Sequence, residues 1–286
     1  MLLLLPAIYF AIFHLAPIYG LQIAFKRYTA SGGIMGSVWV GFQHFQTFFS
    51  SYYFGVLIKN TLELSFGQLL FGFPAPLILA LSINEVTNLR FKRSIQTITY
   101  LPHFLSVAVV VSMIKSFLSP STGVINQLTQ LLGGQAYYYM ADPNWFKPLY
   151  IISGIWQNMG WGSIIYLAAL SAVSVDMYEA AKIDGASRLQ RIWYINLPHL
   201  LPTICTLFIL ETGKIMNLGF EKVFLMQNEL NINASEIIST YIYKKGILGA
   251  QYSFSTAVGL FNSVINLILV LIVNRVSLKV NETSIW

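Results

Sequence analysis

The densest group of charged and small residues in this sequence lies at positions 178–202, which read YEAAKIDGASRLQRIWYINLPHLLP. The stretch separates two long apolar runs, in a chain of which only 10% of the residues are charged. Its small side chains, Ala180, Ala181 and Gly185, allow another surface to approach closely. The carboxylate of Glu179 can form a charge-assisted hydrogen bond with such a surface. This is the chemistry of a docking surface and not of a catalytic centre.

The local pattern predicts two short helices joined at a glycine. Asp176 can cap the first helix at its N-terminus, because a glutamate follows it three residues later, and Gly185 interrupts that helix. The second helix is predicted from Ser187 to Asn196, with apolar and polar residues on opposite faces. Two prolines, Pro198 and Pro202, mark its expected end.

This stretch resembles the EAA loop of type I ABC importer permeases, whose pattern is Glu-Ala-Ala, then Asp-Gly-Ala, then an aromatic residue, an isoleucine and Leu-Pro. The matching positions are Glu179, Ala180, Ala181, Asp184, Gly185, Ala186, Trp193, Ile195, Leu197 and Pro198. The resemblance implies that residues 174–198, here called the EAA segment, form a cytoplasmic coupling helix in a groove of an ATPase subunit. Glu179 would face a basic residue of that groove, and we expect Arg188 to belong to the same docking surface. The alternative is an amphipathic helix lying on lipid, but lipid binding requires neither the Glu-Ala-Ala spacing nor the Asp-Gly spacing.

A second set of polar side chains lies inside the apolar runs. Trp156, Asn158 and Trp161 combine aromatic faces with an amide, and Asn262 and Asn266 lie on one helical stripe of small and amide residues. Sugars stack their apolar ring faces on aromatic rings, and their hydroxyls need donors and acceptors. We therefore predict that these five residues line a substrate pathway. The alternative is that they hold membrane helices together without touching a ligand.

The remaining polar residues predict no catalytic site, no cofactor site and no metal site. The four histidines lie in different segments without metal-ligand spacing, and no Gly-rich phosphate loop of the Walker type occurs. Glu211, Lys214 and Asn217 recur at a spacing of three, where the first two could neutralise one another. Because the chain lacks an ATP site, we expect ATP and Mg²⁺ to be bound by partner ATPase subunits.

The composition predicts an all-α polytopic membrane protein with one transmembrane domain over residues 1–286. Of these residues 56% are hydrophobic and 15% aromatic, and the mean hydropathy is +0.63. The net charge is +6, but the basic residues are scattered through short loops and form no continuous basic stripe. We therefore expect no nucleic-acid partner. The single cysteine, Cys205, excludes an internal disulfide.

Six membrane spans are expected, at about residues 1–25, 56–83, 95–117, 148–173, 199–218 and 254–273. Six spans place both termini on one side of the membrane. Since the sequence opens inside an apolar run, we also expect a short cytoplasmic tail before the first span.

The basic residues of the connectors predict the orientation. The side that holds the EAA segment has eight Lys and Arg residues, and the other side has six. This difference favours a cytoplasmic EAA segment and cytoplasmic termini. The loops at residues 121–147 and 219–253 are then extracellular, where they could meet a binding protein.

The resemblance extends over nearly the whole chain. Three phrases resemble the oligosaccharide branch of these permeases, and the LplB-type sugar permeases in particular: NTLELSFGQLLFGFPAPLILALSINE at 60–85, RFKRSIQTITYLPHF at 90–104 and YSFSTAVGLFNSVINLILVLIVNR at 252–275. The resemblance implies one of two permease subunits, usually different ones, in a bacterial plasma membrane. The resemblance also implies a pair of ATPases on the cytoplasmic side and an extracellular solute-binding lipoprotein. The implied substrate is an oligosaccharide or modified sugar.

Two other functions remain open from the residues. A type I importer permease for another solute, such as a peptide or an amino acid, would share the EAA segment. A secondary transporter driven by an ion gradient would instead show paired inverted repeats and ionisable groups at mid-membrane. No such repeat is visible in the sequence.

Overall fold

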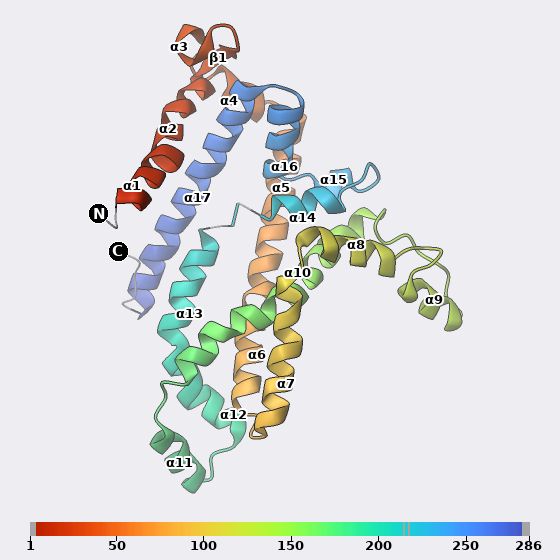
Figure 1. The fold of residues 1–286 in the computed structure, drawn as a ribbon, viewed down its shortest axis with the longest axis vertical. Helices are drawn as coiled ribbons and strands as arrows, with labels where there is room; N and C mark the ends of the chain where they lie inside the picture. The colour runs from red at the N-terminus through yellow and green to blue at the C-terminus, as the bar shows by residue number, and fades with distance from the viewer. Residues whose placement is uncertain (1–3, 214, 217, 282–286) are drawn as a thin grey trace. The chain divides into compact units, whose positions relative to one another are not determined.

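The computed structural model describes residues 4–213, 215–216 and 218–281, and these form helices with one short hairpin (Figure 1). Within these described residues, four helices are long and apolar enough to cross a membrane: Leu4–Phe25, Tyr52–Asn84, Arg188–Thr212 and Tyr252–Val276. Two further helix pairs pass the same test but are bent: Leu89–Phe104 with Val107–Phe117, and Pro143–Leu170 with Val175–Ile183. Six spans result only if each bent pair is one span.

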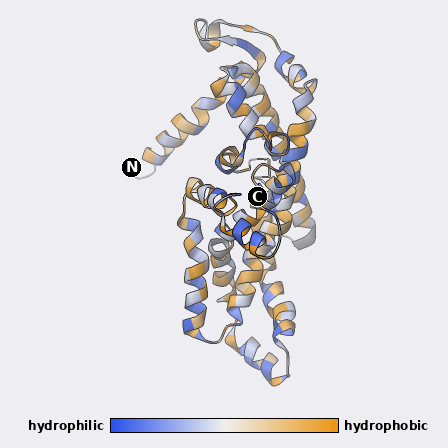
Figure 2. Cartoon of the chain, turned by 90° about the vertical axis from the view of Figure 1, so that its right-hand side faces the viewer, coloured by the Kyte–Doolittle hydropathy of each residue, from blue (hydrophilic) through white to orange (hydrophobic). Residues whose placement is uncertain are grey.

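The surfaces of these helices are suited to lipid. Figure 2 shows hydrophobic residues recurring along the helices, and many large apolar side chains are exposed. In the window that identifies Leu4–Phe25, no residue is buried. In a membrane such surfaces meet hydrocarbon, while the backbone hydrogen bonds stay within each helix.

The chain divides into two compact units, which are described separately. The first comprises Met1–Thr61 and Glu236–Asn266, and the second comprises Leu62–Ser235 and Leu267–Trp286.

The first unit begins with one apolar helical run and a hairpin. The run consists of α1 (Leu4–Phe10), η1 (Ala11–Leu15), α2 (Ala16–Gly20) and η2 (Leu21–Phe25). Strands β1 (Lys26–Thr29) and β2 (Ser37–Trp39) are antiparallel, with Lys26 opposite Trp39, and α3 (Gly33–Gly36) lies between them. The other elements are α4 (Gln43–Phe49), the start of α5 (Tyr52–Gly67), α16 (Ile238–Tyr243), η6 (Lys244–Leu248) and most of α17 (Tyr252–Asn281).

Aromatic packing and one buried carboxylate hold the first unit together. Phe48 is fully buried and contacts the rings of Phe54 and Phe261 edge-on. Glu236 is also buried, and its carboxylate accepts hydrogen bonds from Thr240 and from the ammonium of Lys244, each at 2.7 Å. Because both donors satisfy the carboxylate, its burial is tolerated.

The second unit contains most of the helices. Its elements are the end of α5, η3 (Gln68–Gly72), α6 (Pro74–Asn84), α7 (Leu89–Tyr100), η4 (Leu101–Phe104), α8 (Val107–Phe117), α9 (Val124–Leu131), α10 (Pro143–Leu170), α11 (Val175–Ile183), α12 (Arg188–Arg191), η5 (Ile192–Asn196), α13 (Leu197–Thr212), α14 (Phe220–Met226), α15 (Ile232–Ser235) and the end of α17. Helix α10 lies at its centre and packs against α6, α7 and α13 (Figure 1).

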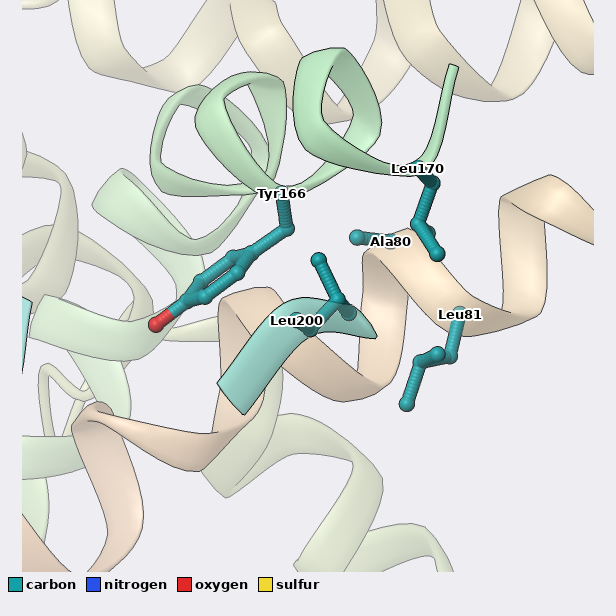
Figure 3. Close-up of a cluster of buried hydrophobic side chains, with 5 residues drawn as sticks. All are labelled: Ala80, Leu81, Tyr166, Leu170 and Leu200. Atoms are coloured by element: carbon teal, nitrogen blue, oxygen red, sulfur yellow. The ribbon is translucent and has the colours of Figure 1, made fainter. Parts of the chain in front are cut away.

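A hydrophobic cluster joins three of these helices. Ala80 and Leu81 of α6, Tyr166 and Leu170 of α10, and Leu200 of α13 are buried together (Figure 3). This cluster fixes the end of the unit from which α11 and α12 project (Figure 1).

A glycine permits the close packing of α10 against α7. A Cβ atom at Gly160 would lie 2.0 Å from the carbonyl oxygen of Thr99, so no larger residue fits this position. Small residues at such crossings are typical of membrane helices.

The helices differ from the six predicted spans in two main places. The third span is not straight, because the chain bends by 101° between η4 and α8, where Ser106 caps α8 by accepting a hydrogen bond from the Val109 amide. The last helix continues past residue 273 to Asn281, so part of the predicted tail is helical. Residues 282–286 of that tail lie outside the described residues.

Candidate functional site

The EAA segment forms a helix with well-defined ends. Helix α11 runs from Val175 to Ile183, and Ser174 caps it by accepting a hydrogen bond from the Asp176 amide at 3.2 Å. The prediction that Asp176 is the N-cap is therefore wrong. Serine is as good a cap as aspartate, and the helix begins two residues earlier.

Gly185 ends α11, as its position in the sequence predicts. Its φ is +74°, in the left-handed region that favours glycine. The amide of Gly185 donates to the carbonyl of Lys182, and the amide of Ala186 donates to that of Ala181. These two hydrogen bonds form a Schellman motif, which satisfies carbonyl groups at the end of the helix.

The second half of the segment differs from the prediction. Helix α12 begins with a capping box between Ser187 and Gln190, but the helix does not end at the prolines. It continues through η5 and α13 as one run of 25 residues, Arg188–Thr212. Pro198 lies in the first turn of α13, where its missing N–H costs little, and a π-helical turn precedes it.

Most of the predicted docking residues are accessible. Glu179, Ala180, Asp184, Gly185, Arg188 and Pro198 are exposed, and Ala181, Ala186 and Leu197 are half-buried. Large apolar side chains are exposed beside them, including Ile183 at 86% and Leu189 at 68%. Apolar side chains this exposed next to a carboxylate are typical of a surface that a partner covers.

The opposite side of the EAA segment is fastened to α6. The hydroxyl of Tyr178 donates to the side-chain oxygen of Asn196 at 2.6 Å, and the amide of Asn84 donates to the same hydroxyl at 3.4 Å. Arg191 forms an ion pair with Glu85 at 2.6 Å, with side chains only 14% and 12% exposed. These contacts could not be predicted from the sequence, because no local pattern indicates which residues of α6 and the segment meet. These contacts join the EAA segment directly to the end of α6.

Two of the predicted pathway residues of α10, Asn158 and Trp161, lie on one face of that helix and contact His103; these three residues are here called the polar patch. Trp156 lies on another side of α10, because two residues correspond to about 200° of helical rotation. The side-chain amide of Asn158 donates to the carbonyl of Gly154 at 3.0 Å, and its oxygen lies 3.1 Å from Nδ1 of His103. The His103 ring stacks on Trp161, with ring centroids 4.7 Å apart and an angle of 5° between the planes. Trp156 and Trp161 are 41% and 46% exposed. The polar patch therefore presents an amide and stacked rings, and it includes His103, which was not among the predicted pathway residues.

Asn262 and Asn266 lie on α17 in the first unit, and both side chains are buried. Their role in a pathway stays a prediction. Of the polar residues near the end of α13, Lys214 and Asn217 lie outside the described residues. Among the residues that the structure describes, no group of three or more His, Cys, Asp or Glu side chains is arranged to hold a metal ion.

These features define a helical membrane protein with an exposed helix–turn–helix segment, and comparison with known proteins identifies its family. A family model described as "Binding-protein-dependent transport system inner membrane component" matches residues 72–281. The chain belongs to this family, which confirms the resemblance drawn from its EAA segment.

Curated relatives match the whole chain. The chain is 46% identical to the protein LplB of Bacillus subtilis, over 100% of this chain and 90% of that protein. It is 44% identical to YteP of the same organism, a polygalacturonan/rhamnogalacturonan transport system permease protein, over 100% of this chain and 89% of the relative.

A solved structure is similar along nearly the full length. It is a bacterial ABC transporter involved in the import of the acidic polysaccharide alginate, with a TM-score of 0.92 and 44% sequence identity over 98% of this chain and 94% of the other. A second structure of a bacterial alginate transporter, in complex with a periplasmic protein that holds an alginate pentasaccharide, has a TM-score of 0.93.

Proposed function

We propose that this chain is a permease subunit of an ATP-driven, binding-protein-dependent importer for an oligosaccharide or modified sugar. The observation that carries the proposal is the full-length similarity to the permeases of polygalacturonan/rhamnogalacturonan and alginate transport. At 44% identity over nearly the whole chain, the similarity includes the membrane helices as well as the EAA segment.

The EAA segment would couple this subunit to a cytoplasmic ATPase. Glu179 and Ala180 are exposed on α11, while Tyr178 of α11 and Arg191 of α12 fasten the segment to the end of α6. A push or pull on α11 would therefore move a membrane helix. In this proposal, two separate ATPase subunits bind ATP and Mg²⁺, and this chain binds no cofactor.

The complete importer would contain three other kinds of partner. These are a second and different permease subunit, two ATPases and an extracellular solute-binding lipoprotein. We place all six spans in a bacterial plasma membrane with both termini in the cytoplasm. Membership in the permease family favours this function over an ion-coupled secondary transporter.

Uptake by the reconstituted complex tests the proposal. The chain would be purified with its co-encoded partners, placed in proteoliposomes and supplied with the loaded binding protein. We expect uptake of a labelled oligosaccharide that requires both ATP and the binding protein. Uptake driven by an ion gradient without ATP, or of peptides or amino acids in place of sugars, would contradict it.

A further inference from the structure

A buried lysine outside the membrane-spanning helices has no role in the function derived so far. Lys222 lies on α14, which packs against α8 and α10 in the second unit (Figure 1). Its side chain is only 7% exposed. Burying a cation is costly unless something compensates its charge.

Within the described residues, no carboxylate forms an ion pair with Lys222. Its ammonium donates a hydrogen bond to the backbone carbonyl of Tyr150 at 3.0 Å, and it lies 4.9 Å from the centre of the Tyr150 ring. These contacts are electrostatically favourable, but neither carries a full negative charge. Burial lowers the pKa of Lys222 to about 8, so most of the molecules keep the charge at neutral pH.

The lysine lies at one end of the polar patch on α10. A Cβ atom at Gly154 would be 3.4 Å from the Lys222 ammonium and 3.3 Å from the side-chain oxygen of Gln68, so both groups lie against the same glycine. One helical turn further along α10, Asn158 donates to the Gly154 carbonyl and contacts His103. The lysine, the glutamine and the asparagine thus follow one face of α10.

An ammonium has three donors, and only one of them is used in the contact with Tyr150. A carboxylate on a sugar ring would supply the missing negative charge and accept a charge-assisted hydrogen bond. The neighbouring amides and the stacked rings of His103 and Trp161 offer what the hydroxyls and ring faces of the same sugar require.

We propose that Lys222 binds a carboxylate of the transported sugar, so that this permease selects acidic oligosaccharides over neutral ones. The proposal rests on the proposed function and narrows its substrate class. One of the similar structures serves the import of an acidic polysaccharide, which agrees with this chemistry.

The test compares two substrates that differ only in charge. One is an acidic oligosaccharide, an oligogalacturonide, and the other is its carboxyl-reduced, neutral counterpart of the same length. Uptake of each by the reconstituted complex gives an acidic-to-neutral ratio. Because wild type and variants share one binding protein, its own preference cancels when their ratios are compared.

Lys222→Gln removes the charge but keeps a hydrogen-bond donor, and Lys222→Arg keeps the charge. We expect Lys222→Gln to lower the acidic-to-neutral ratio about tenfold or more, with neutral uptake retained, because a charged hydrogen bond is lost. Lys222→Arg should keep a ratio near that of wild type. Lys115→Gln is the matched control, since Lys115 is an exposed lysine of α8, and it should leave the ratio unchanged.

The results that would contradict the role of Lys222 differ from those that would contradict the proposed function. An unchanged ratio in Lys222→Gln would overturn the proposal, and so would an equal loss of both substrates, which is what a purely structural lysine predicts. If the wild-type complex takes up neither sugar with ATP, the proposed function itself fails. If it takes up only the neutral sugar, the chain is still an importer subunit, but the proposed selection of acidic sugars by Lys222 is wrong.

Discussion

Arg191 and Glu85 join the EAA segment to the end of α6, and their side chains are 14% and 12% exposed. Removing one member of a pair this buried leaves an uncompensated charge, which costs about 3 kcal/mol or more. We therefore expect Arg191→Glu, which opposes two carboxylates, to lower both the thermal stability of the complex and its ATP-driven transport.

The reversed pair supplies the control for this prediction. Combining Arg191→Glu with Glu85→Arg restores opposite charges at the same two positions, so transport and the melting temperature should recover substantially. If the double variant is no better than the single one, the ion pair does not link the segment to α6.

Asn158 is a residue of the polar patch with two polar contacts. Its side-chain oxygen contacts His103, and its amide donates a hydrogen bond to the Gly154 carbonyl. A pathway role predicts that Asn158→Ala reduces sugar uptake or shifts its preference between sugars, while the basal ATPase rate and the yield of assembled complex persist. Helix-to-helix contact alone predicts poor assembly, since an interhelical hydrogen bond contributes about 0.6 kcal/mol and its loss leaves a packing defect. Assembly yield and uptake, measured on the same preparation, decide between them.

At the scale of the element, the end of α11 depends on the backbone of Gly185. Its φ of +74° is disfavoured for residues with a Cβ, and a Cβ there would meet no atom within 4 Å. The strain in Gly185→Val is therefore conformational, about 1–2 kcal/mol or more for a β-branched residue. We expect this variant to loosen the turn after α11 and to reduce coupling of ATP hydrolysis to transport.

Gly185→Asn is the matched variant, because asparagine adopts left-handed conformations more readily than other residues with a side chain. It should retain most of the coupling. Equal losses in the valine and asparagine variants would mean that the glycine serves close contact with a partner and not the turn.

Some elements of the EAA segment could be read from the sequence and others could not. The glycine turn was predictable, since Asp-Gly after a helical pattern is a local signal. The start of α11 was missed by two residues because Ser174 and Asp176 are comparable caps. The helix through Pro198 was missed because a π-helical turn accommodates the proline.

Contacts between distant segments could not be predicted from local sequence patterns. Tyr178 meets Asn84, and Lys222 meets Tyr150, across separations of 94 and 72 residues. Such pairs depend on which helix faces pack together, and no spacing within one segment reveals that. The buried state of Lys222 was missed for the same reason, because its surroundings in the sequence suggest only a loop.

A cytoplasmic EAA segment fixes the membrane topology of the whole chain, and this topology can be tested by labelling. Cysteines introduced at Gln135 and Leu230, both exposed, should react with a membrane-impermeant reagent in whole cells when Cys205 is replaced by serine. Arg90→Cys, in the basic connector before α7, should react only after the membrane is opened. Leu230 is 66% exposed and suits labelling, whereas the adjacent Asn231 is buried and donates a hydrogen bond to the Met140 carbonyl. Labelling of Arg90→Cys in intact cells would invert the topology.

Glu179→Lys tests whether the EAA segment transmits ATP hydrolysis to this permease. The exposed carboxylate becomes a cation at the proposed contact with a basic groove, while the fastening of Tyr178 and Arg191 to α6 is untouched. The measurement is ATP hydrolysis by the purified complex, with and without loaded binding protein, alongside sugar uptake. We predict that Glu179→Lys assembles in the membrane but loses substrate-stimulated hydrolysis and uptake, whereas full stimulation together with full uptake in that variant would contradict the account.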